Sequence, residues 1–500
     1  MIGSFISATQ RERHRADYDL RREMPIVWRV SYSHGMSDVI VIGGGLAGLA
    51  ASVALSQSGV KVALLESRPR LGGRASSFED AVTGELIDNC QHVAMGCCTN
   101  FRHFCRVTGL ASFFRDEEQL TFIGPPDPSG QQSPKFCRFA ATPFVSAPFH
   151  LGQALWGLGY LSFRDKFAIA RGLLSLRAVQ PQQSDRTTIA EWLDHQRQPA
   201  SAIEYFWNVV LVSALSESLD RISVAAARKV FVDGFLTNRE GWKVSLPTVP
   251  LDELYSGTLA QWLAAHDVDV RLKTGVERLV MEDGAVTAVE LRNGERLAAR
   301  QFVLAVPHQR ALSLLPESIR TLPQLAAIER LETAPIASVH LWFDRPITLL
   351  PHAVLVGRLS QWVFNRGQRS EVRGQKKDAQ PFYYQVVISN AREMAERPQS
   401  EVVAEVVAEL KAIWPWAADA ELRHSRVIIE HHAVFSPLPG SEELRPPQQS
   451  PIENLQLAGD WTRTGWPATM EGAVRSGFLA AENVLVKIGR PAKWLQPDLK

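Results

Sequence analysis

The hydrophobic pattern of the chain is most regular between residues 38 and 66, which read DVIVIGGGLAGLAASVALSQSGVKVALLE. The run from Val39 to Ile42 is short, β-branched and wholly apolar, which is typical of a strand buried on both faces. An Ala/Leu-rich helix that stops at Gly59 follows it. A second apolar run, from Val60 to Leu65, predicts another buried strand. This strand–helix–strand order is typical of a parallel α/β unit.

The turn after the first strand carries three glycines, Gly43, Gly45 and Gly48, in the pattern G-x-G-x-x-G. Gly43 allows a tight turn, Gly45 lets the backbone approach a pyrophosphate, and Gly48 permits close contact between helix and strand. The helix begins near Leu46 and Ala47, so its free N–H groups and positive dipole end can bind phosphate oxygens. The pattern therefore indicates a nucleotide-binding turn, with an ordinary glycine-rich turn as the alternative.

An acidic residue, Glu66, ends the second predicted strand. Its distance along the chain from the glycine turn is close to the ~20 residues expected for an acid that binds the adenosine ribose hydroxyls. Because strand, helix, second strand and acid follow one another in the required order, a nucleotide site is favoured over an ordinary turn. Gly72, Gly73 and Arg74 follow closely and supply two glycines and a guanidinium for a second pyrophosphate contact.

A second, distant segment decides between FAD and NAD. Residues 455–485 read LQLAGDWTRTGWPATMEGAVRSGFLAAENVL, which begins as a strand and ends as an Ala-rich helix. The pair Gly459–Asp460 lies at the predicted strand end, where the carboxylate can bind a ribityl hydroxyl. Met470, Glu471 and Ala473 open the helix, whose N-terminus can face the electron-rich edge of a reduced flavin. An NAD site does not require this distant C-terminal segment, so the N-terminal and C-terminal segments together predict FAD. The alternative is that residues 455–485 form an ordinary closing strand and helix.

The overall composition sets limits on the class of protein. A chain of 500 residues is long enough for two or three domains, and 45% hydrophobic with 21% charged residues is ordinary for a globular protein. The net charge of +1 gives no field that would recruit nucleic acid. Five cysteines do not suggest a disulfide framework, and no apolar run reaches the roughly 18 residues of a membrane span. We therefore expect a cytoplasmic protein.

The first 35 residues, MIGSFISATQRERHRADYDLRREMPIVWRVSYSHG, mix both charge signs and contain no apolar signal core. We expect residues 1–35 to be a disordered extension, with Met36 as the functional start. Acidic residues such as Glu12 and Asp17 disfavour a transit peptide.

Four further segments carry a resemblance to a known family. They are IDNCQHVAMGCCTN (87–100), APIASVHLWFDRP (334–346), QWVFNRG (361–367) and LAGDWTRTGWPATMEGAVRSG (457–477). From about Asp38 to Leu485 the chain resembles the flavin amine-oxidase/carotenoid-desaturase superfamily. Within it, the chain is most similar to the squalene-associated FAD-dependent desaturase-like family, the hydroxysqualene dehydroxylases of bacterial squalene and hopanoid biosynthesis. The flavin motifs belong to the whole superfamily, so the subfamily rests on the other segments.

The resemblance implies an α/β fold in which a doubly wound Rossmann-type FAD-binding domain is interleaved with an α+β substrate domain, a mixed sheet capped by helices. It also implies that the backbone of Val276 meets the adenine. The expected FAD-binding domain comprises residues 36–105, 246–310 and 450–487, and the expected substrate domain comprises residues 106–245 and 311–449.

Residues 88–105, DNCQHVAMGCCTNFRHFC, hold four of the five cysteines and two histidines. Their spacing does not match the C-x₂₋₄-C pairs of structural zinc, so we expect no metal site. Cys98, Phe101 and Cys105 instead fall on one face of a helix, where buried thiols are common. A redox switch stays an alternative, because it needs an exposed thiolate that a sequence cannot show.

In the related flavoproteins, the loop after an acid at the position of Asp88 lies along the isoalloxazine ring. The resemblance therefore makes Gln91 and His92 the candidate catalytic residues. Cys90 stands where this subfamily usually has glycine, which leaves the geometry of the loop open. His92 has two interpretations: a hydrogen-bonded core histidine, or a proton donor beside the flavin.

The function that the resemblance implies is reductive removal of the allylic hydroxyl of hydroxysqualene to give squalene, by hydride transfer from reduced flavin. A carotenoid- or phytoene-type desaturase, an amine oxidase-like flavoenzyme and a flavin-bearing silent partner of a squalene-forming synthase are the alternatives. The implied partners are a long apolar isoprenoid and an upstream squalene- or hydroxysqualene-synthase-like enzyme. Residues 143–176, rich in aromatic and aliphatic side chains, form either helical core or a face in peripheral contact with the inner membrane.

Overall fold

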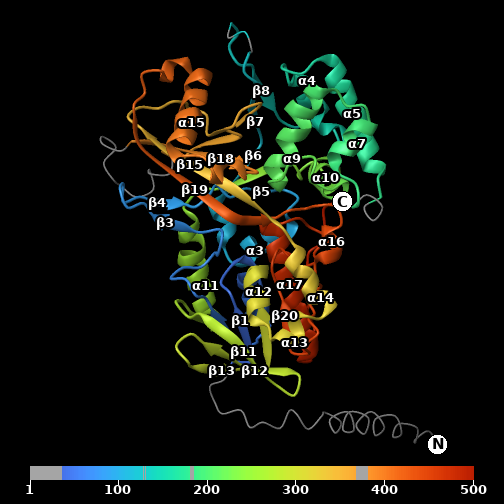
Figure 1. Cartoon of the computed structure of the whole chain (residues 1–500), viewed down its shortest axis with the longest axis vertical. Helices are drawn as coiled ribbons and strands as arrows, with labels where there is room; N and C mark the ends of the chain where they lie inside the picture. The colour runs from blue at the N-terminus through green and yellow to red at the C-terminus, as the bar shows by residue number, and fades with distance from the viewer. Residues whose placement is uncertain (1–36, 128, 130, 181–184, 368–380) are drawn as a thin grey trace, which may run out of the picture. The chain divides into compact units, whose positions relative to one another are not determined.

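A five-stranded parallel sheet carries the glycine turn. The computed structural model describes residues 37–127, 129, 131–180, 185–367 and 381–500, so the extension expected for residues 1–35 lies outside the described residues. Segments far apart in the sequence meet in this sheet (Figure 1). Its strand order is β10 (Asp269–Arg271), β2 (Val62–Leu65), β1 (Val39–Ile42), β14 (Gln301–Leu304) and β20 (Leu455–Leu457).

Strand β1 is buried on both faces, which explains its unbroken apolar run. Val41 packs on one side with helices α2 (Leu46–Gln57) and α17 (Met470–Lys487). Ile42 packs on the other side, against a small sheet and three helices. These elements are β11 (Val276–Glu282), β12 (Ala285–Leu291), β13 (Arg296–Ala298), α12 (His308–Leu314), α13 (Glu317–Arg320) and α14 (Pro323–Ala326).

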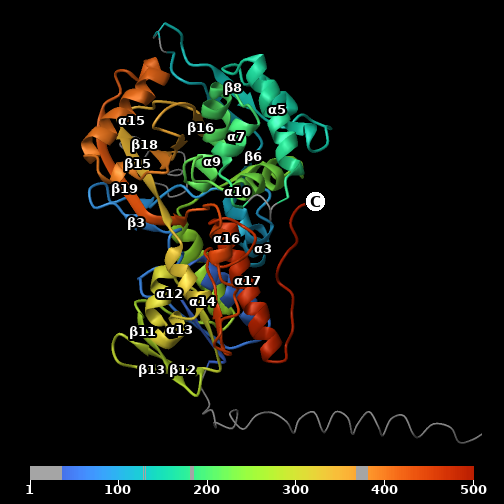
Figure 2. The same cartoon turned by 45° about the vertical axis from the view of Figure 1, so that its right-hand side comes forward.

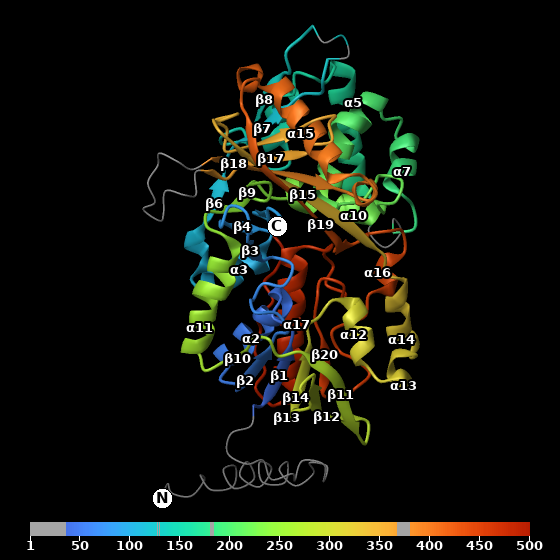
Figure 3. The same ribbon diagram turned by 60° about the vertical axis from the view of Figure 1, so that its left-hand side comes forward.

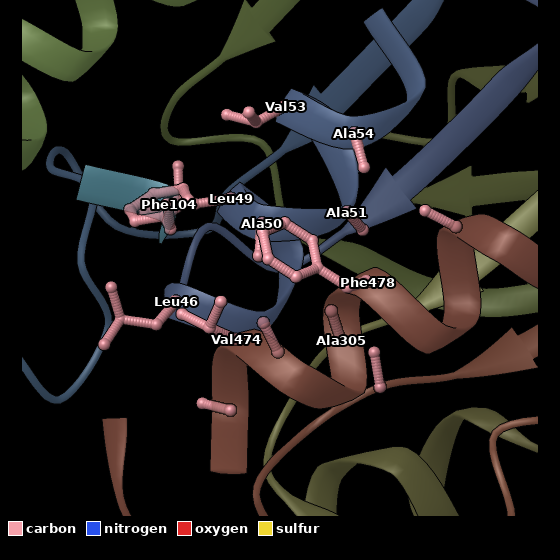
Figure 4. Packing of buried hydrophobic residues seen from close by; sticks show 14 of the residues in the cluster. Leu46, Leu49, Ala50, Ala51, Val53, Ala54, Phe104, Ala305, Val474 and Phe478 are labelled. Carbon is pink, nitrogen blue, oxygen red and sulfur yellow. The ribbon is translucent and has the colours of Figure 1, made fainter. Parts of the chain in front are cut away.

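Helices α2 and α17 pack closely because small residues line their contact. Figure 4 shows Phe478 of α17 beside Ala50 and Ala51 of α2. A Cβ at Gly477 would lie only 2.2 Å from the carbonyl oxygen of Ala47, so this crossing requires glycine. The contact joins the distant C-terminal segment directly to the helix that follows the glycine turn.

A seven-stranded mixed sheet forms the other large layer. Its order is β19 (Leu422–Phe435), β15 (Thr333–Phe343), β18 (Phe382–Ser389), β17 (Trp362–Asn365), β16 (His352–Leu355), β7 (Leu120–Ile123) and β8 (Phe136–Phe139). Strands β16 and β7 are parallel, and the other neighbouring pairs are antiparallel. Helix α15 (Gln399–Ile413) covers one face of this sheet.

A group of helices lies over the opposite face of the seven-stranded sheet, some packed on the sheet and the others packed on those helices (Figures 1 and 2). We call this group the helical cap. It contains α4 (Gly152–Gly157), α5 (Phe163–Ala178), α7 (Ile189–His195), α9 (Asn208–Leu215) and α10 (Val224–Arg228). No helix of the described residues is both long and apolar enough to cross a bilayer.

Short elements link the two large sheets. Figure 3 shows α3 (Thr99–Val107) and α11 (Ala260–Ala265) on the α2 side of the five-stranded sheet, where their residues join the same core. The small strands are β3 (Ser77–Glu79) paired with β4 (Leu86–Asp88), and β5 (Ala94–Met95) and β6 (Phe114–Glu117) on either side of β9 (Val244–Pro247). These layers confirm the predicted α/β fold with a doubly wound sheet and a second, mixed sheet capped by helices. The exact domain boundaries stay a prediction.

Candidate active site

A cavity of about 820 Å³ is lined at one end by the glycine turn and at the other by the helical cap. Both candidate catalytic residues, Gln91 and His92, line it. So does every predicted cofactor residue except Gly48: Gly43, Gly45, Leu46, Ala47, Glu66, Gly72, Gly73, Arg74, Val276, Gly459, Asp460, Met470, Glu471 and Ala473. The structure thus brings the N-terminal and C-terminal halves of the predicted site together around one space.

The glycines of the turn differ in what surrounds them. Gly43 has a φ of +110°, and a Cβ there would lie 2.4 Å from the carbonyl oxygen of Ala305. A Cβ at Gly48 would lie 1.9 Å from the carbonyl oxygen of Gly43, so Gly48 serves helix–strand contact rather than the cavity. A Cβ at Gly45 would meet nothing within 4 Å. Gly45 therefore leaves open space in the cavity wall, where a pyrophosphate can approach the backbone.

Glu66 lies beside this turn with its carboxylate almost fully buried. The carboxylate accepts hydrogen bonds from the N–H groups of Gly44 (2.7 Å) and Arg68 (2.8 Å). Helix α2 begins next to it with Gly45 as N-cap and no side-chain hydrogen bond to its first turn. The N–H groups at this helix end are thus available to an anion, and Glu66 is fixed where a ribose can be bound.

The guanidinium of Arg74 is hydrogen-bonded to other groups of the protein at the cavity wall. It donates to the carboxylate of Asp460 at 2.6 Å and to the carbonyl oxygen of Ala433 at 2.7 Å. Burial acts to lower the pKa of Arg74, but the adjacent Asp460 carboxylate outweighs it and the pKa is raised. The residues predicted to contact pyrophosphate and ribityl chain therefore form an ion pair with each other at the cavity wall.

One backbone N–H group at the start of α17 already has a hydrogen-bond acceptor within the protein. The Thr469 hydroxyl accepts from the N–H of Gly472, and Met470 and Ala473 line the cavity. The carboxylate of Glu471 is fully buried and accepts from the N–H groups of Asn100 (3.1 Å) and Phe101 (2.7 Å). Glu471 thus caps helix α3, a role that its position in the sequence did not suggest.

Val276 lines the cavity on the side of Glu66, whose carbonyl oxygen accepts a hydrogen bond from the N–H of Thr274, two residues before Val276. The carbonyl oxygen of Val276 already accepts a hydrogen bond from the guanidinium of Arg310 at 2.7 Å. Arg310 and Arg292 also line the cavity here, and neither was identified from the sequence. Their positions in α12 and after β12 show no pattern that would have marked them as cavity residues.

His92 is half-buried in the loop that follows β4. Its Nδ1 lies 3.0 Å from the carbonyl oxygen of Cys90. Because a carbonyl can only accept, Nδ1 carries a proton, and Nε2 is the nitrogen left to exchange one. Burial lowers the pKa of His92, although the Cys90 carbonyl and Asp88 act against this. The geometry thus favours a neutral imidazole at rest, without deciding between the two interpretations of this residue.

The same loop is held from the other large sheet by Arg366, which the sequence did not single out. The guanidinium of Arg366 donates to the carboxylate of Asp88 and to the side-chain oxygen of Gln91. All three side chains are buried. Asp88 also accepts from the N–H of Leu251 at 2.8 Å. Gln91 is therefore a bound part of a polar network behind the loop as well as a cavity residue.

The cysteines of this region are free thiols. Burial and, after it, the neighbouring carboxylate of Asp88 raise the pKa of Cys90 to about 12. Burial also raises the pKa of Cys105, which lies in α3 near Phe101, as the helical spacing predicts. Protonated, buried thiols disfavour the redox-switch alternative. Among the described residues, no group of three or more His, Cys, Asp or Glu is arranged to hold a metal ion.

Beyond the loop, the cavity wall becomes almost wholly apolar. Side chains from β7, β8, β17, the helical cap, the residues before β9 and the short helical segments Phe149–Leu151, Ile203–Trp207 and Lys229–Leu236 contribute to it. The aromatic ones are Phe122, Phe139, Phe149, Phe206, Phe231, Phe235, Trp242, Trp362 and Phe364. These residues come from many short elements, so no single stretch of sequence marks them as one surface.

This fold and this site define a flavin-dependent oxidoreductase. The open cradle at Gly45, the buried acid Glu66 and the uncapped start of α2 fit the phosphate and ribose groups of FAD. Residues 46–485 match the family model described as flavin containing amine oxidoreductase. The chain therefore belongs to this family, and FAD is its cofactor.

Known proteins of similar sequence include carotenoid desaturases. The 15-cis-phytoene desaturase of Solanum lycopersicum is 26% identical over 481 residues, covering 92% of this chain and 80% of the relative. The 15-cis-phytoene desaturase of Synechococcus elongatus is 24% identical and covers 90% of this chain and 96% of the relative. An oxidoreductase from Methanosarcina mazei has a similar fold, with a TM-score of 0.66, 17% identity, and coverage of 88% of this chain and 98% of that structure.

Proposed function

We propose that this oxidoreductase removes the allylic hydroxyl of hydroxysqualene and releases squalene and water, as a step of squalene or hopanoid biosynthesis. The observation that carries the proposal is the single cavity that joins the FAD-binding residues to a long apolar space. An apolar wall with few polar groups suits a C30 isoprenoid and offers few groups that could bind a charged amine. The segments at residues 334–346 and 361–367, which resemble the dehydroxylases, contribute Ile336, Trp362 and Phe364 to this wall.

When bound, FAD supplies hydride transfer to or from carbon. The protein's own contribution is to bind, to orient and to keep water out. Glu66 and the N–H groups at the start of α2 would hold the adenosine and phosphate groups, and Asp460 would reach the ribityl chain. The aromatic wall excludes water, which would otherwise compete for an allylic cation formed when the hydroxyl departs.

The departing hydroxyl needs a proton, because hydroxide is a poor leaving group. His92 is the candidate donor on the cavity wall, through Nε2, since its Nδ1 proton is held by the carbonyl of Cys90. Its lowered pKa makes the imidazolium a strong acid when it forms. The same property keeps that form scarce at neutral pH, so turnover through His92 should rise as pH falls.

A second candidate function is desaturation of a carotenoid precursor, in which hydride leaves the substrate instead of entering it. The observation that favours it is the identity of 24–26% to 15-cis-phytoene desaturases over about nine-tenths of this chain. The same apolar cavity suits either substrate class. The two functions differ in the oxidation state of flavin that they require.

One pair of incubations separates the two functions. With dithionite-reduced FAD and hydroxysqualene under argon, the dehydroxylase yields squalene, detected by gas chromatography and mass spectrometry. With oxidised FAD, a quinone acceptor and 15-cis-phytoene, the desaturase yields products with added double bonds. Heat-inactivated protein is the control in both. Unchanged hydroxysqualene together with phytoene turnover would overturn the dehydroxylase proposal.

The proposed substrate also implies a setting. A squalene- or hydroxysqualene-synthase-like enzyme would supply the isoprenoid alcohol, and a cytoplasmic protein in peripheral contact with the inner membrane would receive it. Co-purification of this protein with such a synthase from cells, compared with a strain that lacks the synthase, tests the partnership.

A further inference from the structure

Large apolar side chains are exposed on the helical cap and in the segment that precedes α4. Phe163 and Phe167 of α5 are 81% and 68% exposed. Monomeric proteins rarely show large contiguous apolar patches unless a partner or a membrane covers them. The exposed apolar side chains of this region are Phe144, Phe149, Trp156, Phe163, Phe167 and Leu174.

The side chains of α5 share one face. Phe163, Phe167 and Leu174 follow one another at spacings of four and seven residues, which places them along one side of an α-helix. The ring of Trp156, from α4, lies 6.0 Å from that of Phe163 between centroids. Figure 1 shows α4 and α5 at the outer side of the helical cap. The apolar patch is therefore continuous across two helices at the protein surface.

Positive charge borders this apolar face. Arg164, Arg171 and Arg177 of α5 are exposed, and at 3.6 residues per turn they fall on both flanks of the Phe163–Phe167 line. The acidic residue of α5, Asp165, is buried and accepts hydrogen bonds from the hydroxyls of Ser162 and Ser201, both at 2.7 Å. The exposed charge of α5 is thus wholly positive.

The patch borders the active-site cavity at one place, which we call its mouth. Phe149 and Leu174 are exposed, and both also line the cavity. Arg177 does so as well. An apolar molecule that enters between Phe149 and Leu174 would pass from the patch into the aromatic part of the cavity, with Arg177 at the edge of the mouth.

We propose that this surface, the α5 face (Phe163, Phe167 and Leu174 with Arg164, Arg171 and Arg177), docks on an anionic lipid bilayer. A helix with aromatic residues on one side and arginines at its borders lies in the plane of the interface, with rings among the acyl chains and guanidinium groups at the phosphates. The cavity mouth then opens onto the hydrocarbon. Lipid entry through this mouth rests on the proposed function, whereas docking itself does not.

Vesicle flotation with the FAD-loaded protein tests the proposal. Wild-type protein should float with vesicles of phosphatidylglycerol and phosphatidylcholine, and much less with phosphatidylcholine alone. The double variant Phe163→Ser/Phe167→Ser should bind at least roughly tenfold more weakly, because two rings no longer leave water. The double variant Arg164→Gln/Arg171→Gln should lose roughly 30-fold on anionic vesicles, from about 1 kcal/mol per arginine.

Matched variants away from the helical cap separate a specific surface from a general change in polarity or charge. Leu349→Ser removes an exposed apolar side chain, and Arg106→Gln/Arg330→Gln removes the same charge as the arginine variant. Both should float like the wild type. All variants should keep FAD and their turnover of detergent-dispersed substrate, so a failure of the proposed reaction would leave the flotation result readable.

Three outcomes would overturn the proposal. Wild-type protein that stays at the bottom of the gradient with anionic vesicles is the first. Equal flotation of the wild type and either α5 variant is the second. The third is concentration-dependent self-association that the phenylalanine substitutions abolish while flotation is unchanged, since the α5 face would then bind a second copy of this chain.

Discussion

The guanidinium of Arg366 forms a buried ion pair with the carboxylate of Asp88. Arg366 follows β17 of the seven-stranded sheet, and Asp88 ends β4, directly before the loop that carries Gln91 and His92. The same guanidinium donates to Gln91. Arg366 therefore connects the seven-stranded sheet to the loop at the cavity wall.

We expect Arg366→Met to destabilise the protein by about 3–5 kcal/mol, because it leaves the Asp88 charge buried without its partner. The double variant Arg366→Met/Asp88→Asn should lose less than the sum of the two single changes. Urea unfolding of the four proteins gives the coupling free energy, which we expect to exceed about 1 kcal/mol. Arg345→Met, in the exposed pair with Asp344, is the control that should change little. Additive losses would show that the pair has no special role.

Arg366→Lys tests the positioning role of this residue separately from stability. Lysine keeps the charge but loses the planar fork that reaches Asp88 and Gln91 together. A loop shifted by about 1 Å can cost on the order of 100-fold in rate. We expect kcat to fall by roughly that factor, with FAD content and KM nearly unchanged. A rise in KM with normal kcat would contradict this expectation.

Glu66 should control the affinity for FAD. Glu66→Ala removes a charged acceptor from the ribose hydroxyls, a loss of roughly 1.5–3 kcal/mol, so the Kd for FAD should rise by roughly 10- to 100-fold. Titration of the apoprotein by flavin fluorescence measures this change. Glu66→Gln keeps one acceptor oxygen for the Gly44 and Arg68 N–H groups and separates loss of the turn from loss of the ribose contact. Glu79→Ala, at an exposed position of β3, should leave the Kd unchanged.

The cysteines should behave as inert thiols. Burial raises the pKa of Cys90 to about 12, so its thiolate is scarce at pH 8. We expect the native protein to react only slowly with Ellman's reagent, and the unfolded protein to release all five thiols. A single thiol that reacts within seconds in the native protein would instead support a redox role for this cluster.

The sequence predicts elements that depend on a local pattern better than it predicts contacts between distant residues. The period of apolar residues predicts β1 with its exact bounds, Val39–Ile42, because burial on both faces leaves no polar position. The second strand begins at Val62 instead of Val60. Val60 is also apolar because it is buried in the turn that follows α2, before the strand begins. Local periodicity cannot separate burial in a strand from burial in a turn.

The parts of the site that the sequence misses depend on pairing between distant residues. Glu471 has the position expected of a flavin contact, but its carboxylate caps α3, and only the packing of α17 on α3 decides this. Arg366 lies within a segment that carries the family resemblance, yet its partners Asp88 and Gln91 are almost 280 positions away. The aromatic wall of the cavity comes from many elements, none of which is distinctive alone.

His340 should make the stability of the protein sensitive to acid. It is buried between Ser338 and Tyr383, with Nδ1 2.6 Å from the Tyr383 hydroxyl, and burial lowers its pKa to about 3. The unfolded chain takes up the proton near pH 6.5, so the contribution of His340 is complete above that pH and is lost as pH falls towards 3. At pH 5 the stability already lost amounts to about 2 kcal/mol.

Urea unfolding at pH 7 and pH 5 checks this sign and size. The free energy of unfolding should fall between the two conditions in the wild type, and fall by less in His340→Gln, which can keep one hydrogen bond to Tyr383. Asp80, whose pKa is lowered to about 2, acts in a lower pH range and does not disturb the comparison. An equal drop in wild type and His340→Gln would show that other groups carry the effect.

The last prediction concerns the proton donor. If His92 protonates the departing hydroxyl, His92→Gln should lower turnover by about 10²–10⁴ and leave FAD content unchanged, because the ribose and phosphate contacts lie elsewhere. The pH profile gives the sharper evidence. Since burial lowers the pKa of His92, the imidazolium becomes more abundant as pH falls, and wild-type kcat should rise from pH 8 towards pH 6.

That rise should be absent in His92→Gln and present in His195→Gln, a histidine at the exposed end of α7. Two results would return His92 to a purely structural role. One is near-normal turnover in His92→Gln with an unchanged pH profile. The other is loss of FAD and of folding stability together, because a hydrogen bond from Nδ1 to the carbonyl of Cys90 would then be the whole contribution of this side chain.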